Sequence, residues 1–175
     1  MIRYYIALTL DTDSDRLLRQ SCQTILNHII SIKSLHLTLM PPFFLKADIN
    51  QPDLETLLHT IPNQTHSATL SNLGVFPARN RKILYISLNP AEKFKSLHRQ
   101  LTDQVGTLIQ YDTNVYPNDK LPSFKPHITL SYNYKKTDGV LNLLQESIKD
   151  HPIKLEGPHL FRKKQTSDKT WQKVF

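Results

Sequence analysis

Two stretches of this chain, SLHLTLMPPF at residues 34–43 and FKPHITLSY at residues 124–132, repeat the pattern His-aliphatic-Thr-Leu. Alternation of aliphatic and polar side chains predicts a β-strand, because successive side chains point to opposite faces. Each stretch should therefore bury its aliphatic side chains and present an imidazole and a hydroxyl together on the other face. The two same-face pairs are His36 with Thr38 and His127 with Thr129.

The elements predicted around the two motifs follow a similar order: each motif strand precedes a helix and then a pair of strands. Before the first motif strand we expect a strand at 4–10 and a helix from DTDSD to residue 29. Between the two motif strands we expect a helix at 50–61, a hairpin of strands 67–76 and 82–88, and a helix from 90 to about 109. After the second motif strand we expect a helix at 137–148 and closing strands at 153–161 and 169–175.

This order predicts an α+β fold. The chain has 175 residues, 39% of them hydrophobic, and no low-complexity linker divides it, so we treat 1–175 as a single domain. The repeated order suggests two similar lobes packed about an approximate two-fold axis. Such a packing would place the two motif strands side by side.

Composition excludes several functional classes. With four glycines the chain contains neither a phosphate-binding loop nor a dinucleotide fingerprint, and we expect no cofactor. The eight histidines lack metal-ligand spacing, so we expect no metal site. The single cysteine, Cys22, lies among helical aliphatic residues and should be a small buried side chain. No apolar segment reaches the length of a membrane span, and the cytoplasm is the simplest location.

The net charge of +7 favours a phosphate-rich partner, although a solvated basic surface would give the same count. One His-Thr pair alone is typical of a solvated strand face. Two pairs brought together would offer two imidazoles, which exchange protons near neutral pH, and two hydroxyls that can hold phosphoryl oxygens. Hydrolysis of a phosphodiester needs one base and one acid, and two histidines in opposite protonation states supply both.

The paired HxTL motifs resemble the signature of the 2H phosphoesterase superfamily, and within it the RNA 2',3'-cyclic phosphodiesterases, also called 2'-5' RNA ligases. The resemblance includes RYYIAL, HLTL, LGVFPARNRKILYISL and FKPHITLSY in the family's order. It implies a bilobal fold with two antiparallel-sheet lobes flanked by helices around a central cleft. It also implies metal-independent hydrolysis of 2',3'-cyclic phosphates to 2'-phosphates, with reversible ligation in some members.

By this resemblance His36 is the general acid on the leaving oxygen, His127 is the general base on water, and Thr38 and Thr129 bind the phosphate. The reverse assignment of acid and base stays open, because near-symmetric sites exchange roles with the direction of reaction. Relatives often follow the second motif with Ala-Arg, whereas this chain has Ser131 and Tyr132. This difference bears on which substrate the protein prefers more than on the reaction that it catalyses.

Five further residues are candidates for substrate binding. Arg79, Arg81 and Lys82 lie in the basic turn of the predicted hairpin, where they could contact phosphate or serve solubility. Phe43 and Tyr132 could stack on a base or pack within the protein.

The resulting hypothesis is a monomeric, metal-free cyclic phosphodiesterase whose partner is RNA or a nucleotide with a cyclic phosphate. Two alternatives remain: a non-catalytic domain that binds RNA ends, and a 2H phosphodiesterase acting on 2',5'-linked or cyclic oligonucleotides.

Overall fold

The computed structural model describes residues 2–26, 30, 32–78, 81–111, 123–132, 134, 138–164 and 170–175. The helices are α1 (Thr12–Leu26), α2 (Gln51–His59), α3 (Ala91–Val105) and α4 (Asp138–Ile148), with a short 3-10 helix η1 (Gly106–Leu108) after α3. The strands are β1 (Ile2–Leu10), β2 (His36–Leu45), β3 (Gln64–Ala78), β4 (Arg81–Asn89), β5 (Ile109–Tyr111), β6 (His127–Ser131), β7 (Pro152–Lys164) and β8 (Gln172–Lys173).

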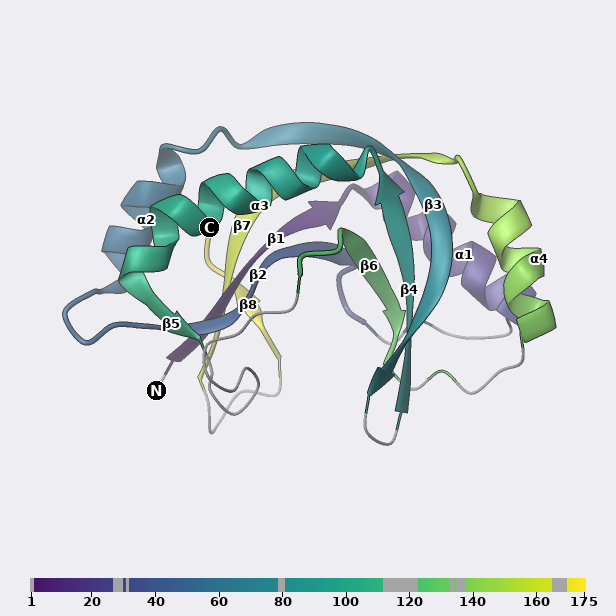
Figure 1. Cartoon of the computed structure of the whole chain (residues 1–175), viewed down its shortest axis with the longest axis horizontal. Helices are drawn as coiled ribbons and strands as arrows, with labels where there is room; N and C mark the ends of the chain where they lie inside the picture. The colour runs from purple at the N-terminus through teal and green to yellow at the C-terminus, as the bar shows by residue number, and fades with distance from the viewer. Residues whose placement is uncertain are drawn as a thin grey trace.

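The strands form one antiparallel sheet in the order β1-β2-β6-β4-β3-β7-β8, with β5 on the far end of β2. β7 pairs with β3 through its first half and with β1 through most of its length, so the hydrogen-bonded pairs close into a circuit. Figure 1 shows the result as an arch in which α2 and α3 cover one end, and α1 and α4 pack together at the other. The α+β class and the two-lobed arrangement predicted from the sequence are confirmed.

The two motif strands, β2 and β6, are neighbours at the centre of the arch (Figure 1), as the repeat predicted. Their register places Leu37 opposite Ile128. On the outer sides Leu8 of β1 is opposite Leu37, and Ile86 of β4 is opposite Ile128. These four side chains have no exposed surface, so one row of aliphatic residues crosses four strands and anchors the motif strands in the core.

Helix boundaries follow capping chemistry where the sequence supplies it. Asn50 and Asp53 form a reciprocal capping box at the start of α2, with Pro52 in the first turn. The helix predicted from 90 to about 109 ends earlier, at Val105. Residues 106–108 tighten into η1, and Ile109 begins β5, which pairs with β2, because the β2 edge there offers hydrogen-bond partners that a continued helix would leave unused.

β3 contains a bulge whose backbone groups are bound by side chains from two sides. The register with β4 shifts between Leu70 and Leu73. Gln145 of α4 accepts from the Leu73 amide at 2.5 Å and donates to the Ser71 carbonyl at 2.7 Å. Ser87 of β4 binds both backbone groups of the residue between them, Asn72. The side chains thus replace the ladder bonds that the bulge removes.

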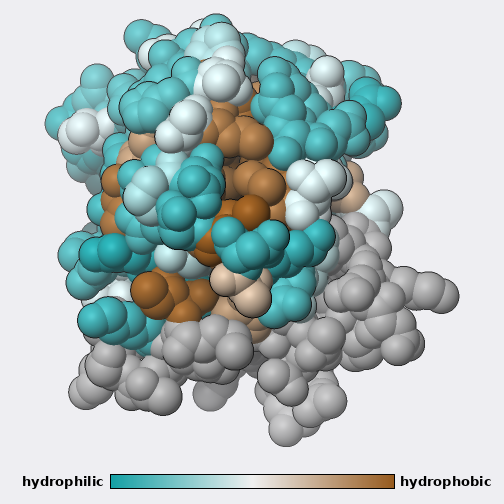
Figure 2. All heavy atoms as spheres, turned by 90° about the vertical axis from the view of Figure 1, so that its left-hand side faces the viewer, coloured by the Kyte–Doolittle hydropathy of each residue, from teal (hydrophilic) through white to brown (hydrophobic). Residues whose placement is uncertain are grey.

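The surface at the α2 end is mainly hydrophilic, with a hydrophobic band through its centre (Figure 2). Cys22 is fully buried and free, as predicted, and burial raises the pKa of its thiol to about 12. Among the described residues, no helix combines the length and the apolar character that crossing a membrane requires.

Candidate functional site

The four motif side chains share one face of the central strands, opposite the aliphatic core row. Because β2 and β6 are antiparallel with Leu37 opposite Ile128, His36 lies beside Thr129, and Thr38 lies beside His127. All four side chains are half-buried. We call this set of four the histidine-threonine face. Each imidazole therefore has the threonine of the other motif as its cross-strand neighbour.

The same register relates the two histidines by a local two-fold axis. It places His36 and His127 diagonally across the strand pair, at a Cα separation of about 7–8 Å. The hydroxyls of Thr38 and Thr129 occupy the other diagonal. A single tetrahedral phosphorus can be contacted by side chains from all four corners of such an arrangement. The outer strands continue the symmetry, since Thr9 of β1 is opposite His36 and Ser87 of β4 is opposite His127.

Both imidazoles are held in the same way. The Nδ1–H of His36 donates to the Ser34 carbonyl oxygen at 2.8 Å, and the Nδ1–H of His127 donates to the Lys125 carbonyl oxygen at 2.6 Å. A carbonyl oxygen can only accept, so Nδ1 carries the proton in each ring. Nε2 is then the nitrogen that accepts or releases a proton.

Burial lowers the pKa of both histidines below its ordinary value. For His36 the bond to the Ser34 carbonyl opposes this shift, and the neighbouring His127 lowers the pKa further, because two positive charges would repel. For His127 burial again lowers the pKa, and the Lys125 carbonyl opposes the shift. Burial therefore favours the neutral form of both rings.

Aromatic side chains flank His36. Tyr5 of β1 lies 5.3 Å from the His36 ring and Phe161 of β7 lies 6.4 Å from it, measured between ring centroids. Tyr5 stacks on Phe161 at 4.6 Å and meets the edge of Trp171 at 4.7 Å. These side chains form a small cluster separate from the main core, and we call it the aromatic wall of His36.

His127 has an equivalent aromatic wall. Tyr85 of β4 and Phe76 of β3 approach its ring in edge-on contacts at 5.4 and 5.0 Å, and stack on each other at 4.0 Å. The Tyr85 ring lies directly over Gly74, where an added Cβ would collide with the end of the ring. Only glycine at position 74 leaves room for this placement of Tyr85.

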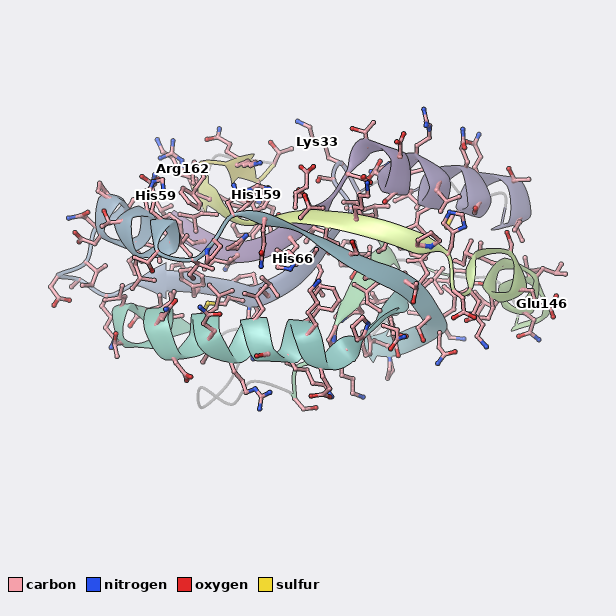
Figure 3. All side chains as sticks on the ribbon, turned by 90° about the horizontal axis from the view of Figure 1, so that it is seen from above. Lys33, His59, His66, Glu146, His159 and Arg162 are labelled. Carbon is pink, nitrogen blue, oxygen red and sulfur yellow. The ribbon has the colours of Figure 1, made fainter. Side chains whose placement is uncertain are left out.

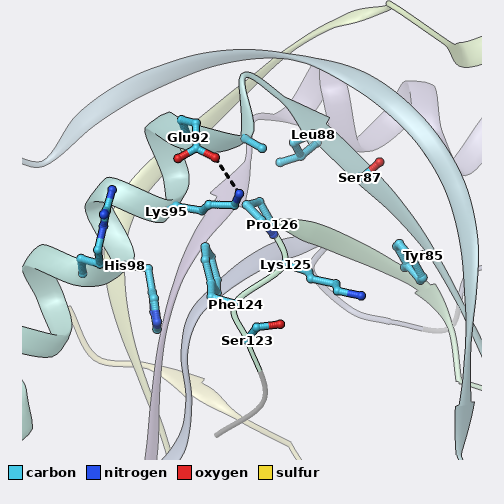
Figure 4. A pocket seen from close by; sticks show the side chains of 12 residues that line it. Tyr85, Ser87, Leu88, Glu92, Lys95, His98, Ser123, Phe124, Lys125 and Pro126 are labelled. Atoms are coloured by element: carbon cyan, nitrogen blue, oxygen red, sulfur yellow. Dashed lines mark hydrogen bonds and ion pairs between the residues drawn. The ribbon is translucent and has the colours of Figure 1, made fainter.

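A pocket of about 670 Å³ adjoins the site on the His127 side. It lies between α3, β4 and the segment that leads into β6 (Figure 4). Its lining includes Tyr85, Ser87, Lys95, Arg99, Phe124 and Lys125.

The other predicted substrate-binding residues have different positions. Phe43 is fully buried and stacks on Tyr4, so the expectation that it contacts substrate is corrected: β2 continues into the core beyond the motif. Lys82 is exposed at the start of β4. Arg79 lies outside the described residues, and of Arg81 only the backbone, within β4, is described.

Tyr132 is 44% exposed and lies near the aromatic wall of His36. The pKa of the Tyr5 phenol is raised first by burial and then by the nearby Tyr132 phenol, which places these two side chains close together. Tyr132 thus follows β6 and lies near Tyr5.

Sequence reasoning missed the two aromatic walls. Alternation within KILYISL already places Tyr85 and Ser87 on the face opposite Leu84 and Ile86. This alternation points to the candidate site only in combination with the pairing of β4 and β6, which the sequence does not reveal.

Among the other histidines, His66 and His159, which are labelled in Figure 3, have 3% and 5% of their surface exposed. Within the ranges that the structure describes, no three His, Cys, Asp or Glu side chains gather in a way that could hold a metal ion.

The family model described as "2'-5' RNA ligase superfamily" matches residues 30–165. No curated protein matches the chain by sequence. The similar solved structures include three that cover 99% of this chain. TT0787 of Thermus thermophilus has 20% identity, a TM-score of 0.62 and 95% of its own length covered. Escherichia coli LigT, complexed with 3'-AMP, has 16% identity, a TM-score of 0.57 and 95% covered. Kluyveromyces marxianus Usb1 with uridine monophosphate has 15% identity, a TM-score of 0.52 and 97% covered. At these identities the likeness concerns the fold.

Proposed function

The chain belongs to the 2'-5' RNA ligase superfamily of 2H phosphoesterases, and from that premise we propose that it hydrolyses 2',3'-cyclic phosphodiesters on RNA ends or nucleotides to 2'-phosphates. The observation that carries the proposal is the diagonal placement of His36 and His127, each with Nδ1 bound to a backbone carbonyl and each beside a threonine of the other motif.

In the proposed reaction Nε2 of neutral His127 removes a proton from water as the water oxygen attacks phosphorus. The bond between phosphorus and O3' breaks, and Nε2–H of protonated His36 donates its proton to O3'. The products are a 2'-phosphomonoester and a free 3'-hydroxyl. The hydroxyls of Thr38 and Thr129 donate to the nonbridging oxygens, where negative charge accumulates in the transition state.

The substrate itself supplies the required protonation state. The anionic phosphate attracts a proton to one of two imidazoles whose pKa values are otherwise low, because a nearby negative charge favours the charged ring. The second imidazole then stays neutral, since the first now repels a further proton. One acid and one base thus arise from two similar groups, and each positioned group contributes roughly 10²–10⁴-fold in rate.

The first test is turnover of uridine 2',3'-cyclic phosphate by pure protein treated with a chelator, with the product identified by phosphorus NMR. We expect the 2'-phosphate, the same rate after chelation, and no gain from added Mg²⁺ or Zn²⁺. His36→Ala and His127→Ala should each lower kcat by at least about 10²-fold. His151→Ala, which removes an exposed histidine, is the matched control. Full activity in both site variants would contradict the proposal. Tight binding without turnover by the unmodified protein would instead support a non-catalytic RNA-end-binding domain.

A second test separates acid from base. Sulfur in place of the leaving O3' departs as a thiolate and needs no proton, so this substrate should restore His36→Ala far more than His127→Ala. The opposite pattern would exchange the two roles. Assays with 2',5'-linked and cyclic oligonucleotides, run in parallel, test the alternative substrates.

A further inference from the structure

Asp15 of α1 is connected to His36 through a single peptide group. We propose that Asp15 is a positioning residue for His36: through the peptide group between Ser34 and Leu35 it fixes the imidazole and favours the protonated ring. This inference rests on the proposed function and adds to it a residue that makes the two similar histidines unequal.

The peptide group between Ser34 and Leu35 has both of its polar atoms occupied. Its N–H, on Leu35, donates to Oδ1 of Asp15 at 3.3 Å, and its carbonyl oxygen, on Ser34, accepts from Nδ1 of His36 at 2.8 Å. The peptide is trans, so its N–H and C=O point in opposite directions within one plane. Asp15 on one side therefore turns the carbonyl oxygen toward the imidazole on the other. Leu35 is itself fixed, because its carbonyl accepts from the Leu10 amide at 3.1 Å and its side chain is buried.

Arg19, one helical turn after Asp15, holds the carboxylate in this place. Its guanidinium forms two hydrogen bonds with the Asp15 carboxylate, at 2.6 and 3.0 Å. The same guanidinium donates to the carbonyl oxygens of Ile30, Ile32 and Lys33 at 3.1, 2.8 and 3.3 Å. The side chains of Asp15 and Arg19 are only 27% and 29% exposed, so water screens this ion pair less than one on the open surface. The pair thus ties α1 to the segment that leads into the first motif strand.

The corresponding peptide group at His127 cannot be held in this way. Nδ1 of His127 donates to the carbonyl oxygen of Lys125, and the next residue is Pro126, which has no amide hydrogen. That peptide group therefore has no N–H to donate to a carboxylate. At His36 the α1 carboxylate polarises the peptide group, which makes the Ser34 carbonyl a stronger partner for a positively charged ring. Of the two imidazoles, His36 is therefore the one that is protonated first.

The groups that face the His36 ring from the neighbouring strands, among the described residues, do not supply this preference. His127 of β6 opposes a positive charge on His36. Tyr5 of β1 is neutral, because burial raises the pKa of its phenol to about 13. Phe161 of β7 carries no charge. The carboxylate of Asp15 thus acts against the repulsion between the two histidines.

The test compares kcat for uridine 2',3'-cyclic phosphate with kcat for the analogue in which sulfur replaces the leaving O3'. Asp15→Ala should lower kcat on the oxygen substrate by about ten- to a hundredfold, as the displacement of a catalytic group does. The loss should be much smaller on the sulfur substrate, because its leaving group needs no proton from His36. Asp15→Asn, which keeps an oxygen that can accept from Leu35, should move the alkaline limb of the kcat/KM profile to lower pH, because the charged imidazole loses a nearby negative charge.

The matched control is Asp13→Ala, which removes an exposed carboxylate of the same helix together with its ion pair to Arg16, and it should change neither kcat nor the pH profile. An equal loss on the two substrates in Asp15→Ala, or a larger loss on the sulfur substrate, would overturn this inference, because Asp15 would then act on the fold alone. Unchanged kcat on the oxygen substrate would overturn it too. These outcomes leave the proposed function intact.

If the unmodified protein turns over neither substrate, the proposed function fails, and the imidazoles are titrated by NMR in the presence of inorganic phosphate. A pKa of His36 that lies above that of His127 and falls in Asp15→Asn supports the role of Asp15. A pKa of His36 that lies below that of His127, or that does not change in Asp15→Asn, contradicts it.

Discussion

Leu37 and Ile128 lie opposite each other in the antiparallel pair of β2 and β6, and both are fully buried. This one register decides the geometry of the candidate site, because it turns the flanking His36 and His127 to the same face and sets them on a diagonal. A shift of the pairing by one residue would bury the polar side chains and expose the aliphatic ones. The core row therefore positions the four side chains of the candidate site.

The pH dependence of the reaction should reflect the lowered pKa values of both histidines. The active form carries one protonated and one neutral ring, so kcat/KM should follow a bell with its maximum below about pH 6.5. Above the higher pKa both rings are neutral and the acid is lost; below the lower pKa both are charged and the base is lost. The kcat profile should lie at higher pH, because bound phosphate raises the pKa. A kcat/KM that stays constant between about pH 5 and 8 would contradict the two-histidine mechanism.

Gly74→Ala should impair turnover more than folding. The added Cβ would meet the end of the Tyr85 ring, and this ring can move aside at small cost, but it would then leave its contact with His127. We expect kcat to fall about ten- to a hundredfold, as small misplacements of catalytic groups do, with the melting temperature lowered only slightly.

The matched control for this change is Gly106→Ala, because an added Cβ there meets no atom within 4 Å. Tyr85→Val removes the ring that Gly74→Ala displaces. The double variant should therefore be no less active than Tyr85→Val alone. Additive losses would show that Gly74 acts in some other way.

Gln145→Ala should destabilise the fold by about 1–3 kcal/mol, since it leaves the Leu73 amide and the Ser71 carbonyl at the bulge without their side-chain partner. Urea unfolding measures this loss. Glu146→Ala, on the exposed side of the same helix (Figure 3), should change the stability by less than about 0.5 kcal/mol. Equal effects of the two substitutions would mean that the bulge does not depend on the glutamine.

Acidification should destabilise the protein through His159. Burial, followed by the charge of Lys173, lowers the pKa of His159 to about 4 in the folded state. In the unfolded chain the pKa is about 6.5, so between these values the unfolded state binds more protons, and stability falls as the pH falls. His66, also buried with a lowered pKa, adds to the effect.

We expect the unfolding free energy to drop by about 1–2 kcal/mol between about pH 7.5 and pH 5 on account of His159. His159→Gln should reduce this drop, whereas the exposed His151→Gln should not. An unchanged pH dependence in His159→Gln would show that other groups are responsible.

The sequence by itself determined which side of each motif strand is polar. Alternation with a period of two is a local property, so the burial of Leu37 and Ile128 and the placement of the His and Thr side chains on the opposite face followed from the printed residues. The hairpin of β3 and β4 was predictable for the same reason. The end of α3 was not, because β5 forms only where β2 offers an edge.

Tertiary structure alone decided which side chains surround the histidines. Tyr5, Phe161, Tyr85 and Phe76 reach the site from strands far away in the chain, and nothing in their own segments indicates which strand each will pair with. The pocket between α3 and β6 is likewise a consequence of packing. The geometry of a single strand determines which side chains share a face. Which side chains of other strands lie beside them depends on the hydrogen-bond register between the strands, and that register is fixed only when the whole core assembles.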